Sequence, residues 1–238
     1  NDTHPTLAIP ELMRILLDEC GYDWEAAFDI CQRTFAYTNH TVMSEALEKW
    51  SIDIFKMTLP RIYTIVQEMD RRCRAALEQA FPGDQGKIDY MAILGDGQVR
   101  MANICCYTCH AINGVSKLHS EIIKKSVFHD YYLYKPNAFK NVTNGIAYRR
   151  WLLASNPRLT NLLCETIGEG FKTDAAQLSK LARFKDDKKV LEALDKVKAD
   201  NKAGFAAYLE KTTGQVIDPS SIFDCQVKRM HEYKRQHL

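Results

Sequence analysis

The sequence has no long apolar run and no excess of charge of one sign. No stretch of its 238 residues approaches the roughly 20 apolar residues that a membrane-spanning helix needs. Its 32 basic residues nearly balance its 30 acidic ones, and a net charge of +2 gives no general attraction to nucleic acid or a membrane surface. Internal repeats and low-complexity segments are also missing. These absences predict a globular protein that acts on neither membranes nor nucleic acids.

Neither end of the sequence has the features typical of a natural chain end. The sequence opens on "NDTHPTLAIP" with neither a methionine nor a signal peptide. It closes on "HEYKRQHL" without a residue that ends a helix. We therefore expect a fragment of a longer chain.

The cysteines do not form a dense framework. A secreted disulfide scaffold is short and rich in cysteine, whereas these residues are scattered through apolar segments. We therefore expect reduced thiols and a cytoplasmic protein. The eight cysteines are Cys20, Cys31, Cys73, Cys105, Cys106, Cys109, Cys164 and Cys225.

One cysteine cluster matches a known pattern. Cys106, Cys109 and His110 form C-x-x-C-H, the attachment signature of a c-type haem, and the two cysteines alone form a C-x-x-C redox pair. A zinc site needs four ligands, and the sequence has no second pair of this kind. The cluster lies in the apolar run "MANICCYTCH", where cysteine behaves as a small hydrophobic residue. We favour core packing with no metal, and a redox or metal site remains the alternative.

The spacing of apolar residues is mostly helical, so we predict a helix-rich α/β fold. A composition change rich in Pro, Asn and Gly places a domain boundary near Asn144. In the helix over 115–128 we expect Val115, Leu118 and Ile122 to face inward, with Ile123 as a further candidate. The predicted helices cover 5–19, 24–34, 44–50, 52–80 with a break at Pro60, 115–128, and most of 149–211 with interruptions at Gly168 and around 184–187. Residues 101–110 fit a helix or a strand, and we favour a helix. The predicted strands begin at 35, before a loop at 38–41, and at 221.

Two polar turns, "NDTHP" at 1–5 and "YTNHTV" at 37–42, place an Asn or Asp beside a His. A third, "NVTNGI" at 141–146, adds Asn144 before a glycine. Each has an ordinary structural explanation, because Asn, Asp and Thr favour turns and helix starts. Neither a nucleophile elbow nor metal-ligand spacing accompanies them. Such side chains would suit a ligand rich in hydroxyl groups, such as a sugar.

A basic cluster follows the last predicted strand, in "VKRMHEYKRQ". Phosphate binds where a strand turns into a helix, because the helix N-terminus favours anions. Arg offers phosphate a two-pronged contact and Lys offers a point charge. A solvated basic helix start explains the same residues equally well, and both interpretations stay open. The cluster contains Lys228, Arg229, His231, Lys234 and Arg235.

Taken together, seven stretches resemble the α-glucan phosphorylases, the family of glycogen, starch and maltodextrin phosphorylase. They follow the family's order and spacing, and the resemblance covers essentially all 238 residues. The family has text similar to "CHAVNGV" where this chain has Cys109 and His110, in a protein without haem, so C-x-x-C-H is explained as an accident. The stretches are "NDTHPTLAIPELMRIL", "FAYTNHTV", "EALEKW", "CHAINGVSKLHSEI", "NVTNGI", "RRWLLASNP" and "VKRMHEYKRQ".

The resemblance implies a GT-B fold, in which two Rossmann-like domains face a cleft. Residues 1–143 would be the C-terminal part of the first, glucan-binding domain, and 144–238 would begin the second, which binds pyridoxal phosphate. The implied reaction is phosphorolysis of terminal α-1,4-glucosidic bonds by orthophosphate, giving α-glucose 1-phosphate with retention. The intact protein is expected to be a homodimer.

The roles of the family's site residues can be assigned to the matching positions in the motifs of this sequence. The resemblance implies that His40 and Asn144 bind the glucosyl hydroxyls, and that the His40 carbonyl faces the developing positive charge. Asp2 and Thr41 would line the adjoining cleft.

The basic cluster receives roles in the same way. Lys228 would contact the cofactor phosphate, Arg229 and Lys234 would hold the substrate phosphate, and Tyr233 would lie close to the sugar. The family's pyridoxal-binding lysine corresponds to a position after Leu238, and its Gly-rich phosphate loop to one before residue 1. The chain alone is therefore expected to be inactive.

The family's pattern is altered at two turns. This chain has "NGIAYRR" where "NGITPRR" is common, and "TVMSEALEKW" where a proline is common before the Glu. These are local changes. A non-catalytic carbohydrate-binding or interaction module of the same fold remains the alternative function.

Overall fold

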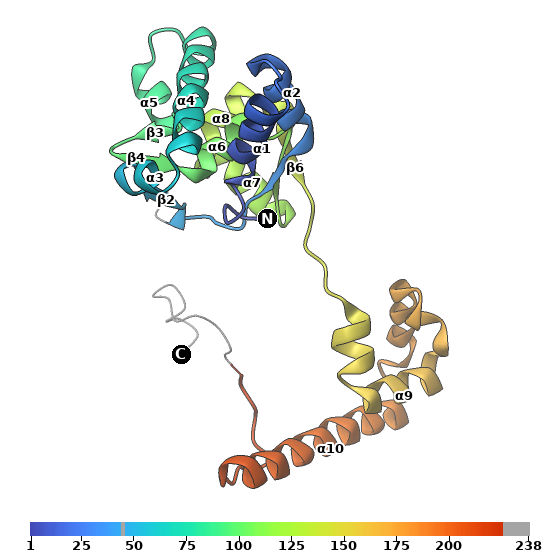
Figure 1. The fold of residues 1–238 in the computed structure, drawn as a ribbon. Helices are drawn as coiled ribbons and strands as arrows, with labels where there is room; N and C mark the ends of the chain where they lie inside the picture. The colour runs from blue at the N-terminus through green and yellow to red at the C-terminus, as the bar shows by residue number, and fades with distance from the viewer. Residues whose placement is uncertain (44–45, 226–238) are drawn as a thin grey trace. The chain divides into compact units, whose positions relative to one another are not determined.

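The chain folds into two compact units, Asn1–Gly145 and Ile146–Leu238. The computed structural model describes residues 1–43 and 46–225, and Figure 1 shows their helices and strands. The boundary expected at Asn144 lies beside this division, and the assignment of the units to Rossmann-like domains stays a prediction. Among the described helices, none is both long and apolar enough to cross a membrane. The predicted helix-rich α/β class is confirmed.

A parallel sheet organises the first unit. Its strands are β1 (Ala36–Thr38), β5 (Ala111–Gly114) and β6 (Phe139–Asn141), in the order β1-β5-β6. Both pairings are parallel, with Ala36 opposite Ala111 and Ile112 opposite Phe139. All three strands therefore end at the same edge of the sheet, where ligands bind in open α/β sheets. The strand β6 lies in the Pro-, Asn- and Gly-rich segment that leads to the predicted domain boundary, where the sequence predicts no strand.

Helices pack around this sheet and bury one apolar core. The helix α6 is almost entirely buried and contacts β1, α1 and α2, while α1 also packs along the long helix α4 (Figure 1). The break predicted at Pro60 is confirmed, because α3 ends at Thr58 and α4 begins at Pro60. The helices are α1 (Ala8–Arg14), η1 (Ile15–Glu19), α2 (Trp24–Thr34), α3 (Ile52–Thr58), α4 (Pro60–Ala80), α5 (Gln85–Met91), α6 (Met101–Thr108), α7 (Lys117–Ile122), η3 (Ile123–Val127), α8 (His129–Tyr134) and η4 (Pro136–Ala138).

A small antiparallel sheet replaces one predicted helix. Its strands are β2 (Lys49–Ser51), β4 (Gln98–Arg100) and β3 (Leu94–Gly95), in the order β2-β4-β3. The helix predicted over 44–50 is therefore wrong from Leu47 onward, where a bend leads into β2, and residues 44–45 lie outside the described part. Trp50 pairs with Val99 on β4, so long-range pairing overrides the local helical spacing.

A nearly buried carboxylate joins this small sheet to α4. Asp70 accepts a hydrogen bond from the Leu94 N–H at 2.9 Å and another from Arg74 Nε at 2.9 Å. Arg74 also donates to Asp89 and to the Leu94 carbonyl. Two charges and one backbone amide are thus satisfied together, which fixes β3 against the helix.

The helix predicted over 115–128 begins at Lys117, and the side chains that it buries differ from those predicted. Ser116 caps α7, since its hydroxyl oxygen accepts a hydrogen bond from the His119 N–H at 3.0 Å. This start turns His119 and Ile123 inward and leaves Leu118 73% exposed. The prediction that Leu118 faces inward is therefore wrong.

The thiol cluster belongs to the core. Cys105, Cys106 and Cys109 are buried among apolar side chains, and all eight cysteines are free. Within residues 1–43 and 46–225, no group of three or more His, Cys, Asp or Glu side chains could hold a metal ion. The prediction of core packing is confirmed.

Thiol reactivity should follow this burial. Burial raises the pKa of Cys31 to about 11 and that of Cys73 to about 12, which suppresses the reactive thiolate. We expect the exposed Cys20 and Cys225 to react rapidly with a thiol reagent in the native protein. All eight cysteines should react in denaturant without reductant, and a count short by two would contradict the structure by revealing a disulfide.

The described part of the second unit is helical. It contains η5 (Arg149–Ala154), α9 (Pro157–Ile167), η6 (Glu169–Lys172), η7 (Ala175–Phe184) and α10 (Lys188–Thr213). The predicted interruption at Gly168 is confirmed, because this residue ends α9 with a φ of +82°. The strand predicted to begin at 221 is absent from residues 221–225, and its remainder lies outside the described part.

Candidate functional site

The candidate site lies at the carboxyl edge of the parallel sheet. Thr38 ends β1, and its carbonyl accepts a hydrogen bond from the Asp2 N–H at 2.8 Å. The Thr38 hydroxyl donates to Asn113 Oδ1 at 2.7 Å, which links the ends of β1 and β5. The N-terminal turn and two adjacent strands therefore meet at one place.

His40 is exposed but stands between two anchored residues. Asn39 is completely buried; its N–H donates to the Asn113 carbonyl at 3.0 Å, and its side-chain amide donates to the Tyr37 hydroxyl at 3.0 Å. The remaining oxygen of this side chain accepts from the Thr41 N–H at 2.9 Å. The loop consequently presents the His40 ring outward on a fixed backbone, with Nε2 hydrogen-bonded to Asn1 Oδ1.

Asp2 adopts an unusual backbone conformation at this edge. Its φ of +56° lies in the left-handed region, which costs a non-glycine residue on the order of 1 kcal/mol. The bond to Thr38 holds the residue there, and its own carboxylate accepts from the Thr3 N–H at 2.9 Å. Thr3 in turn donates to Glu48 at 2.6 Å, which fastens the turn to the segment before β2.

Asn144 reaches the same edge from β6. Its N–H donates to the Val115 carbonyl at 2.8 Å, so the turn between β5 and α7 fixes its backbone. The side chain is exposed and free to meet a ligand. The structure thus brings four predicted site residues, Asp2, His40, Thr41 and Asn144, to one end of the first unit.

The other predicted residues lie outside the described part of the chain. These are Lys228, Arg229, Tyr233 and Lys234, and their roles stay predictions.

Sequence reasoning missed one residue of this edge. His119 is buried, and its ring hydrogen-bonds the backbones of Val115 and Thr41, at 3.1 Å in each case. The available signal was its place three residues after Ser116, the helix cap, which turns it toward the sheet.

One buried lysine has a structural role. Burial lowers the pKa of Lys135, as in lysines that form Schiff bases. Its Nζ donates to the carbonyls of Tyr107 at 2.7 Å and Cys109 at 3.1 Å, which satisfies the end of α6. We therefore give this amine no role toward an aldehyde cofactor.

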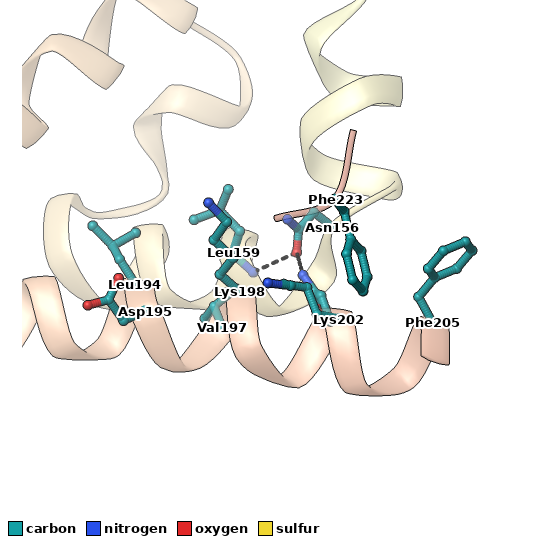
Figure 2. Close-up of a pocket in the computed structure, with 10 residues that line it drawn as sticks. Asn156, Leu159, Leu194, Asp195, Val197, Lys198, Lys202, Phe205 and Phe223 are labelled. Atoms are coloured by element: carbon teal, nitrogen blue, oxygen red, sulfur yellow. Dashed lines mark hydrogen bonds between the residues drawn. The ribbon is translucent and has the colours of Figure 1, made fainter. Parts of the chain in front are cut away.

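A separate pocket of about 480 Å³ lies in the second unit (Figure 2). Asn156 anchors it, since its Oδ1 accepts from the Leu159 N–H and from Asn201 Nδ2. Five of the ten described residues that line it are apolar and five are polar or charged, and none is a predicted site residue. It does not extend the candidate site.

Known proteins resemble the whole chain. The family model described as carbohydrate phosphorylase matches residues 1–238. Human glycogen phosphorylase, muscle form, is 49% identical over 241 residues, which span all of this chain and 29% of the human protein. Bovine glycogen phosphorylase, brain form, is 48% identical with the same coverage. The chain therefore spans less than a third of these relatives' length, and it belongs to the carbohydrate phosphorylase family.

Proposed function

We propose that this chain is a segment of an α-glucan phosphorylase. The whole protein would cleave terminal α-1,4-glucosidic bonds with orthophosphate and release α-glucose 1-phosphate with retained configuration. One observation carries the proposal: in a member of this family, Asp2, His40, Thr41 and Asn144 meet at the carboxyl edge of a parallel sheet.

The exposure and anchoring of His40 and Asn144 support the proposal that they hold a sugar. Both side chains are exposed. The Asn144 N–H donates to the Val115 carbonyl, and hydrogen bonds hold Asn39 and Thr41, the two neighbours of His40. Fixed donors and acceptors that orient the glucosyl ring lower the entropic part of the barrier.

The backbone of His40 supplies a second contribution. Departure of the glucan builds positive charge on the glucosyl ring, which a carbonyl dipole stabilises when it is already in place. Asn39 and Thr41 are both anchored, so the intervening carbonyl needs little reorganisation during the reaction.

We assign phosphate binding to the basic cluster. Arg229 and Lys234 would hold the substrate phosphate, with Tyr233 close to the sugar. Lys228 would contact the phosphate of pyridoxal phosphate, the cofactor that we propose for the whole protein. When bound, this cofactor supplies chemistry through its phosphate group rather than its ring. A cationic clamp is needed because two neighbouring phosphates repel each other.

The finer architecture is part of the same proposal. We assign a GT-B fold to the whole protein, with residues 1–143 in its first Rossmann-like domain and 144–238 beginning the second. The free cysteines support a cytoplasmic protein. A homodimer is proposed from the family resemblance alone.

The test is steady-state kinetics of the full-length protein with maltooligosaccharide and orthophosphate. Arg229→Ala should weaken phosphate use, with kcat/KM falling about 10- to 100-fold, because a hydrogen bond to a charged group is worth about 1.5–3 kcal/mol. Arg229→Lys should recover only part of this loss. His40→Ala should lower turnover more than the apparent affinity for phosphate.

Arg33→Ala provides the matched control, since this side chain is 71% exposed and forms an ion pair with Asp29 alone within residues 1–43 and 46–225. Unchanged phosphate affinity and turnover in Arg229→Ala would refute the clamp. A wild-type protein that binds maltooligosaccharide but releases no glucose 1-phosphate would be a carbohydrate-binding module instead.

A further inference from the structure

The turn between β5 and α7 connects the loop of His40 to the segment of Asn144. Val115 lies in this turn, and its carbonyl accepts from the Asn144 N–H at 2.8 Å. Its N–H donates to His119 Nδ1 at 3.1 Å, while His119 Nε2 lies 3.1 Å from the Thr41 carbonyl. One imidazole therefore stands between the two parts of the candidate site.

The partners of His119 determine its tautomer. A backbone N–H can only donate, so Nδ1 carries no proton; a carbonyl can only accept, so Nε2 carries one. The ring is neutral in this arrangement and makes both hydrogen bonds at once. It is also buried, at 7% exposure, so water competes little for either bond.

We propose that His119 is a positioning residue that holds the Thr41 carbonyl and thereby sets the backbone of His40. Asn39 fixes one side of His40 through Tyr37 and Asn113, and His119 fixes the other side. His119 itself contacts neither sugar nor phosphate. The effect on catalysis rests on the proposed function, whereas the hydrogen bond from His119 to the Thr41 carbonyl exists whatever the protein does.

Two substitutions separate the two hydrogen bonds of the ring. The oxygen of Asn at position 119 lies near the place of Nδ1, so His119→Asn retains the acceptor for Val115 and loses the donor to Thr41. The amide nitrogen of Gln reaches the place of Nε2, so His119→Gln retains the donor to Thr41. If His119 only supports the turn at Val115, the protein should tolerate His119→Asn. If His119 holds the Thr41 carbonyl, the protein should tolerate His119→Gln instead.

The experiment uses the full-length protein and both variants. His119→Asn should lower kcat about 10- to 100-fold with little change in KM for maltooligosaccharide, because small misplacements of a positioned group have effects of that size. His119→Gln should stay within about threefold of the wild type. Hydrogen exchange over residues 39–43 should accelerate in the Asn variant and remain slow in the Gln variant.

Exchange in α4 serves as the folding control and should be unchanged in both variants. Wild-type kcat together with wild-type protection of residues 39–43 in the Asn variant would overturn the proposal, and so would equal losses in both variants. If the wild type lacks phosphorolysis, the proposed function fails, while the exchange measurement still decides whether His119 holds the loop.

Discussion

Gly114→Ala is expected to destabilise the first unit by at least about 3 kcal/mol, as sterically forced core changes can. A Cβ at this position would lie 2.7 Å from the Ser120 N and 2.8 Å from its Cα. These are backbone atoms of α7, so the start of the helix must move away from β5. His119 and the turn at Val115 move with it, and the phosphorolysis proposed for the full-length protein should fall at least about 100-fold.

Unfolding in denaturant and steady-state kinetics check this expectation. Gly86→Ala is the matched control in the same unit, because the nearest atom to its added Cβ is a side-chain oxygen 3.9 Å away. Gly95→Ala gives a second comparison, since the three atoms nearest to its Cβ belong to the Arg100 guanidinium, a side-chain group that can shift only by giving up hydrogen bonds to backbone carbonyls. A Gly114→Ala protein with wild-type stability would show that α7 does not approach β5 so closely.

Asp70→Ala is expected to weaken the attachment of β3 to α4 by about 3 kcal/mol. The substitution leaves the Leu94 N–H without its acceptor, at about 1–3 kcal/mol, and removes a charge-assisted bond from Arg74. The Leu94 amide should then exchange roughly 100-fold faster, since 1.4 kcal/mol corresponds to a factor of ten.

Native-state hydrogen exchange of the full-length protein measures this effect. Asp89→Ala removes another carboxylate partner of Arg74, but Asp89 is 55% exposed, so its loss should change the exchange rate less than about fivefold. If the two variants exchange alike at Leu94, Asp70 does not anchor β3.

Local signals were enough to predict most helices. Asp23 caps α2 by accepting from the Ala26 N–H, and Pro60 begins α4, as their side-chain chemistry indicates. The strands β2 and β6 could not be predicted in this way. Trp50 and Phe139 acquire extended structure through partners that are distant in the sequence, Val99 and Ile112.

In the candidate site, too, local signals indicate some residues and long-range contacts determine others. His40 and Asn144 stand in polar turns that the sequence marks plainly, and the motifs give them roles. The function of His119 depends on Thr41, a residue 78 positions away, so only the folded chain reveals it. Its burial also hides it from a search for exposed polar groups.

The pairing of β1 with β5 also governs when the site can form during synthesis. The paired residues are 75 positions apart, so a ribosome adding 5–20 residues per second needs about 4–15 s to deliver the second strand. Asn144 is made later still. Until then the edge of β1 has no native partner in this sheet, and an unpaired strand edge invites pairing with other chains. The residues proposed to hold the sugar therefore come together late, by a slow, long-range step that is exposed to aggregation.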